Sequence, residues 1–184
     1  MKKKVVIIII LLICLISLIF SEDLGIENQD QKLWKTVEDF KNAEPKIIKA
    51  INLLLENPLS EEIKDLNDFV MMWAVDVPYI TLTINTDYVS GLYKEKDNDY
   101  KYMGVLTVSY LFGNLLYILE NPSNESTEFE AIKKSLITLI QVYDKINQQK
   151  QDGYFEFMDN LKTIYVNNEL DNYIISIQKH SKNK

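Results

Sequence analysis

Residues 100–119, YKYMGVLTVSYLFGNLLYIL, decide the fold of this chain. Lys101 carries the single charge of the stretch, and the large apolar residues fall on every side of a helix of that length. A helix that is apolar all round has to be covered by other helices, so the stretch predicts the central helix of an all-α bundle. Gly104 and Gly113 lower its helix propensity, and we expect close approach of a neighbouring helix in return.

The segments before this helix carry apolar residues at helical spacing, three and four residues apart. One helix is expected to open around Trp34, and a second to have Pro45 in its first turn, where proline is tolerated. Ser60, followed by two acids, favours the start of a third, which must end before Pro78. These patterns predict consecutive αα-hairpins.

The segments after the central helix continue the pattern. Three apolar stripes follow the central helix, over residues 129–146, 155–165 and 170–177. A short helical pattern also begins at Asp87, before the central helix. We therefore predict a single helical bundle of about six or seven helices in an orthogonal or layered arrangement.

The tetrapeptide Leu-Glu-Asn-Pro occurs twice, at residues 55–58 and 119–122. Each copy closes an apolar helix, and Asn followed by Pro is an ordinary way to stop one. The same stop chemistry used twice explains the repeat. The alternative is a duplicated helical hairpin.

Residues 79–84, YITLTI, break the helical pattern. They alternate with a period of two and are rich in β-branched and aromatic residues, which predicts one short extended segment. A lone strand cannot make a sheet. The segment is therefore expected to lie across helices, to pair with another short segment, or to offer an edge to a partner.

The N-terminus resembles an export signal in its layout. Lys2, Lys3 and Lys4 precede an uncharged stretch over residues 5–20, and Ser21 opens a polar, acidic region. A helix of roughly 16 residues is about 24 Å long, which is short of the roughly 30 Å hydrocarbon core of a bilayer. We predict a signal peptide over residues 1–21, with an uncleaved anchor as the alternative.

Cys14 adds a third possibility, acylation of the kind found in lipoproteins. The large Ile13 before it and the apolar residues after it favour Cys14 as an ordinary member of the apolar stretch.

The remaining chain is divided into a linker over 22–31, a helical domain over 32–179 and a disordered tail over 180–184. The sequence thus predicts a periplasmic or extracellular protein, or one anchored in the membrane and facing outward.

Charge excludes several classes of partner. The net charge is −7, and every one of the 20 basic residues is lysine. Without arginine there is no bidentate group for phosphate or guanine, and the acidic balance repels polyanions. We exclude nucleic acid and expect membrane contact only through the N-terminal segment. The abundance of Ile, Asn, Lys and Tyr indicates an AT-rich, bacterial genome.

Residues for common catalysis are missing. The one histidine is His180, near the C-terminus, and the one cysteine is Cys14, so nucleophilic triads and zinc sites lack their components. Residues 97–99 have acidic and amide oxygens without the rest of a calcium loop. We predict no metal, no cofactor and no enzymatic activity. The alternative is a hydrolase that uses carboxylates alone, for which Asp65 with Asp68, or Glu156 with Asp159, would be candidates.

Asp76 is the candidate binding residue, because it interrupts an uncharged run over residues 69–84. Together with Trp73 and Tyr79 it is predicted to form the lip of a pocket or groove. The alternative places Asp76 at a helix end, where it accepts backbone N–H bonds. Eleven tyrosines add to this interpretation, since tyrosine suits binding surfaces as well as helix packing.

Taken together, these patterns predict an exported bacterial helical protein of the cell envelope. It would act as a non-catalytic protein-interaction or ligand-binding module, with a protein of the envelope as a possible partner. An immunity-type inhibitor that binds a toxin through its acidic face is the alternative within the same class.

Overall fold

Seven α-helices and two 3-10 turns make up the described part of the chain in the computed structural model, which covers residues 33–82, 86–94, 100–121, 128–150 and 154–181. No strand occurs among these residues, which confirms the predicted all-α bundle and the number of its helices. The elements are α2 (Val37–Glu56), η1 (Glu61–Ile63), α3 (Lys64–Asp76), η2 (Thr86–Val89), α4 (Gly91–Lys94), α5 (Met103–Glu120), α6 (Glu128–Gln149), α7 (Glu156–Val166) and α8 (Leu170–Ser181).

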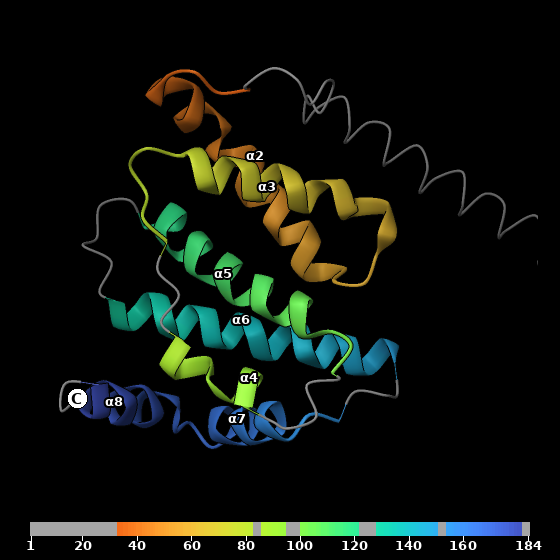
Figure 1. Cartoon of the computed structure of the whole chain (residues 1–184), viewed down its shortest axis with the longest axis vertical. Helices are drawn as coiled ribbons and strands as arrows, with labels where there is room; N and C mark the ends of the chain where they lie inside the picture. Colours follow the sequence, from red (N-terminus) through yellow and green to blue (C-terminus); the bar gives the residue numbers. More distant parts are fainter. Residues whose placement is uncertain (1–32, 83–85, 95–99, 122–127, 151–153, 182–184) are drawn as a thin grey trace, which may run out of the picture.

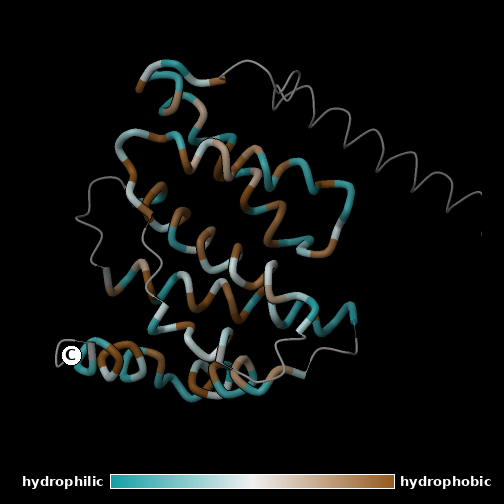
Figure 2. Tube along the Cα trace, in the orientation of Figure 1, coloured by the Kyte–Doolittle hydropathy of each residue, from teal (hydrophilic) through white to brown (hydrophobic). Residues whose placement is uncertain are grey.

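The helices form layers, with α2 and α3 on one side, α5 and α6 in the middle, and α4, α7 and α8 on the other side (Figure 1). Hydrophobic residues recur along each helix (Figure 2), as packing on more than one neighbour requires. Two core clusters result. One joins α2 and α3 to the later turns of α5, and the other joins the start of α5 to α6, α7 and α8.

The central position of α5 follows from its composition. Leu115 and Leu116 are buried in the core with α2 and α3, while Leu106 and Tyr110 are buried in the core with α6. Among the described helices, α5 is also the one long and apolar enough to cross a membrane by length and composition. Half of its residues are buried inside the protein, and its other apolar side chains are half-buried.

The start of α2 differs from the prediction. Two helices were expected, one opening around Trp34 and one at Pro45, but a single helix runs from Val37 to Glu56 with Pro45 inside it. A capping box fixes its start, because the Asp39 N–H donates to Thr36 Oγ1 at 3.1 Å and the Thr36 N–H donates to Asp39 Oδ2 at 2.9 Å. Pro45 is exposed and leaves the buried stripe of the helix continuous.

The two glycines of α5 play different roles. A Cβ on Gly113 would lie 2.7 Å from Ser135 Cα and 2.8 Å from Thr138 Oγ1, so this glycine allows the close approach of α6 that was predicted. A Cβ on Gly104 would meet nothing within 4 Å. The prediction was therefore wrong for Gly104, which faces open space.

The two Asn-Pro copies end their helices in the same way. The Asn57 side-chain amide donates to the Leu53 carbonyl at 3.3 Å, and the Asn121 amide donates to the Tyr117 carbonyl at 2.9 Å. Both asparagines adopt nearly the same backbone angles, with φ of −127° and −129°. The two copies of the tetrapeptide therefore end their helices with the same hydrogen bond and the same backbone conformation.

The segment after α3 has no regular structure over residues 79–82. Ile80 and Leu82 are half-buried and pack on the core formed by α2 and α3. Of the three arrangements expected for it, this part of the segment lies across helices. Residues 83–84 lie outside the described part of the chain.

The predictions on the termini are tested only in part. The signal peptide, Cys14 and the linker all lie in residues 1–32, outside the described residues, as do residues 97–99. At the other end, α8 extends to Ser181 and so includes His180, whose Nδ1 lies 2.7 Å from the Ser176 carbonyl oxygen. The helix therefore continues into the region expected to be the tail.

Candidate functional site

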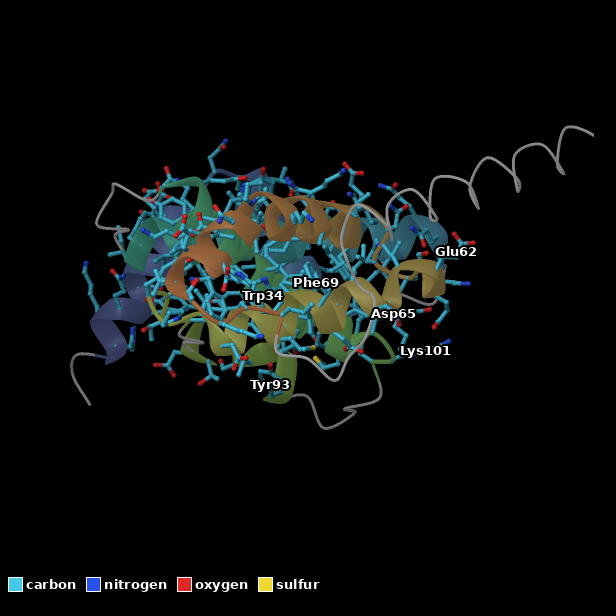
Figure 3. All side chains as sticks on the ribbon, turned by 90° about the horizontal axis from the view of Figure 1, so that it is seen from above. Trp34, Glu62, Asp65, Phe69, Tyr93 and Lys101 are labelled. Carbon is cyan, nitrogen blue, oxygen red and sulfur yellow. The ribbon has the colours of Figure 1, made fainter. Side chains whose placement is uncertain are left out.

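Trp73, one of the three predicted binding residues, lies in the core. Its side chain is fully buried, at 0% exposure, and its indole N–H donates to the Phe40 carbonyl at 3.3 Å. The Phe40 ring packs on it with a centroid separation of 6.2 Å, and Trp34 and Phe69 extend the same aromatic cluster (Figure 3). Trp73 thus joins α3 to α2, and its indole is not available to a ligand at the surface.

Tyr79 and Asp76 lie at the surface. The Tyr79 hydroxyl donates to Glu44 Oε1 at 2.8 Å, and the Lys41 ammonium lies 5.8 Å from the ring centroid. Partial burial and the bond to Glu44 raise the pKa of the Tyr79 phenol above its ordinary value. Asp76 is exposed and is the last residue of α3, which is where the helix-end alternative places it. Neither residue lines the apolar pocket between α2, α5 and α6.

The ends of α2 and α6 and the starts of α3 and α5 lie at the same end of the bundle (Figure 1). Residues from these four segments line a pocket of about 610 Å³. Its walls are mainly apolar and come from α2, α5 and α6. The residues that carry this apolar surface are Leu54, Leu55, Val105, Val108, Phe112 and Val142. Because Val142 and Phe112 belong to the buried cores, the pocket reaches from the surface to the interior.

The stop after α2 builds one wall of this pocket. Asn57 closes the helix, since its backbone N–H donates to the Leu53 carbonyl at 3.0 Å, and the Ser60 N–H then donates to the Asn57 carbonyl at 3.1 Å. The turn holds Pro58 and Leu59 against the opening. The first copy of the repeated tetrapeptide therefore leads directly into the site.

Gly104 forms part of the opposite side. It lies in the first turn of α5, it is exposed, and no atom would contact a Cβ at this position within 4 Å. A bare helix surface of this kind lets a ligand approach the backbone closely. Sequence analysis singled out Gly104 for helix approach and missed this role, although a glycine in an otherwise apolar first turn was the available signal.

Four charged side chains line the pocket. Three are the lysines Lys64, Lys101 and Lys150, and one is Glu61. The Lys101 ammonium lies 5.5 Å from the centroid of the Tyr102 ring. All four charged side chains are exposed, so they belong to the mouth of the pocket rather than to its interior.

The carboxylates considered for hydrolysis are placed elsewhere. Asp65, Asp68 and Glu156 are exposed, and Asp159 accepts a hydrogen bond from the Tyr143 hydroxyl at 3.0 Å. Glu61 is the single acid among the residues that line the pocket. Across the described residues, no group of three or more His, Cys, Asp or Glu side chains could hold a metal ion.

Comparison of this chain with protein families, with curated proteins and with solved structures finds no match. The shape and chemistry of the pocket are therefore the guide to what the protein binds.

Proposed function

We propose that this protein is an exported, non-catalytic binding module of a bacterial envelope, and that its pocket takes a small molecule with an apolar body. The observation that carries the proposal is the pocket of about 610 Å³ with apolar walls. Sites for small molecules typically have volumes of about 300–1,000 Å³, mostly apolar linings and a few polar groups at defined places. Export is supported by the charged and apolar pattern of residues 2–20.

The size of the site favours a small molecule over a protein. A stable protein interface covers about 800 Å² on each partner, which is far more than one pocket mouth. The charged side chains are exposed at the mouth, while the apolar ones are half-buried or buried. This arrangement suits a ligand that inserts an apolar part and leaves a polar part near solvent.

The direct test is a titration with N-phenyl-1-naphthylamine, a neutral apolar dye whose fluorescence rises when it leaves water. We expect saturable binding to the wild-type protein. Gly104→Leu adds a large side chain at a lining position where a Cβ meets no other atom within 4 Å, and it should weaken binding at least about tenfold, which corresponds to about 1.4 kcal/mol. Asn172→Leu, at an exposed position of α8 away from the pocket, is the matched control and should bind as the wild type does.

Two results would overturn the binding proposal: wild-type protein that does not bind the dye, or a Gly104→Leu variant that binds it unchanged. The export part has its own test. N-terminal analysis of protein recovered from a bacterial envelope fraction should find a chain that begins near Glu22, or the intact segment held in the membrane. Protein confined to the cytosol with Met1 retained would contradict export.

A further inference from the structure

The charges at the pocket mouth define the ligand further. We propose that the pocket binds an amphipathic anion, with an apolar chain between α2 and α5 and an acidic head group held by Lys64, Lys101 and Lys150. This inference rests on the proposed function, because it assigns the head group of the ligand that enters the same pocket.

The first argument is the local balance of charge. Acids outnumber bases in the whole chain, at 27 to 20, yet lysines outnumber acids among the residues that line the pocket, at three to one. The three lysines come from α3, from the turn before α5 and from the residue after α6, so tertiary structure brings them together. Within the described residues, none of the three ammonium groups forms an ion pair. Among the described residues, no acid therefore competes with an anionic ligand for these lysines.

The helix ends add to the same potential. The η1–α3 segment and α5 both begin at the pocket, and neither Ser60 nor Tyr102 caps these starts with its side chain. The N-terminus of a helix carries a partial positive charge that favours anions. The C-termini of α2 and α6 are also nearby and oppose this effect. The Lys145 ammonium donates to the Leu55 carbonyl at 3.0 Å and offsets the C-terminus of α2, and Lys150 directly follows the C-terminus of α6.

Nearby acids limit how far this potential extends. Glu62 and Asp65 lie at the same end of the molecule as Lys101 (Figure 3), and neither lines the pocket. Attraction of an anion from a distance is therefore weak, and recognition depends on direct contact with the lysines at the mouth. Such contact between exposed charges should weaken at high ionic strength, where the screening length falls to about 3 Å at 1 M salt.

The apolar walls account for the other half of the ligand. Leu54, Val108 and Phe112 offer a surface for a hydrocarbon chain, and Gly104 leaves room beside it. Each methylene group that leaves water should raise affinity by about fourfold. A ligand with a single chain and a compact acidic head uses both features of the site.

The test compares amphiphiles that share a twelve-carbon chain and differ in the head group, at concentrations below their aggregation limits. Each one competes with N-phenyl-1-naphthylamine for the full-length protein. We expect dodecanoate or dodecyl phosphate to displace the dye at concentrations at least about tenfold lower than dodecanol, with dodecylammonium the weakest. Comparison of the two anions distinguishes a fatty-acid head from a lipid phosphate head, and a preference for either one supports the proposal.

The lysines are tested with charge-matched variants. Lys64→Gln combined with Lys101→Gln should reduce the preference for the anion over dodecanol to less than about threefold while dodecanol still binds. Lys46→Gln combined with Lys179→Gln, at exposed positions away from the pocket, removes the same charge and should keep the preference. Retention of the preference in the first double variant, or its loss in the control, would refute the assignment to these lysines.

The two proposals fail in different ways. If dodecanol or dodecylammonium binds at least as tightly as both anions, the head-group assignment fails while the apolar pocket stands. If neither the dye nor any of the four amphiphiles binds, the pocket itself is not a binding site and the proposed function fails.

Discussion

Gly113→Ala is the substitution whose outcome the structure determines most directly. The added Cβ would lie 2.7 Å from the Cα of Ser135 and 2.8 and 2.9 Å from Oγ1 and Cβ of Thr138. Carbon atoms in contact prefer separations of about 3.5–4.0 Å, so α5 and α6 must move apart locally by roughly 1 Å. The nearest atom belongs to the backbone of α6 and cannot rotate away.

The net free energy combines two opposing effects. Forcing an extra carbon into a packed interface costs about 1–3 kcal/mol. Replacing glycine by alanine inside a helix stabilises the helix by up to about 1 kcal/mol. Because the clash is with backbone, we expect the packing cost to dominate and the protein to lose about 1–2 kcal/mol of stability. For a domain of this size that corresponds to a decrease in Tm of roughly 2–8 °C.

Gly104→Ala is the matched control in the same helix. Its Cβ enters open space, so the gain in helix propensity is unopposed and stability should rise by up to about 1 kcal/mol. Urea unfolding followed by circular dichroism at 222 nm gives both values on one scale. A Gly113→Ala variant at least as stable as the wild type, or equal shifts in the two variants, would refute the described packing of α5 on α6.

Three further predictions concern buried side chains. Tyr143→Phe should destabilise the fold by about 1–3 kcal/mol, because the Tyr143 hydroxyl donates to Asp159 and accepts from the buried Phe155 N–H. Tyr100→Phe should be neutral or stabilising, because no described residue forms a hydrogen bond with the Tyr100 hydroxyl. Equal losses of stability for the two variants in urea unfolding would contradict this prediction. Burial raises the pKa of both phenols, so the folded state holds these protons more tightly than the unfolded chain does. Stability is then fully present below about pH 10 and falls as pH rises above it, which unfolding curves between pH 8 and 11 would show, and a flat profile would contradict it. Trp73→Ala should cost about 3–5 kcal/mol through a core cavity, as measured by thermal unfolding, and a loss below about 1 kcal/mol would place the indole outside the core.

The main features of the fold could be predicted from the sequence because they depend on local chemistry. Residues 100–119 are apolar on all sides, and no arrangement other than the middle of a bundle covers every side with protein. The ends of α2 and α5 were marked by asparagine, which stops a helix with bonds to carbonyls a few residues away. Pro45 led to a wrong helix start, because proline is a strong local signal for the first turn of a helix. The capping box nine residues upstream and the continuous buried stripe decide where the helix begins.

The candidate site could not be predicted in the same way. Trp73 and Asp76 were chosen because they stand out along the chain, but burial depends on which helix packs on which face. The indole N–H is satisfied by the Phe40 carbonyl of a different helix, and no sequence spacing reports that bond. Likewise, Gly104 and Gly113 have similar apolar neighbours in the sequence. Only the position of α6 shows that Gly113 packs against another helix and that Gly104 faces open space.

For this protein, then, the sequence by itself determined the helical class and the identity of the central helix, and it predicts export, since each depends on composition and short-range periodicity. The tertiary structure alone decided where a ligand could enter. The pocket mouth joins Lys64, Lys101 and Lys150 from three segments that are distant along the chain. Such a meeting depends on how the helices cross, which is set by the packing of all the buried side chains together.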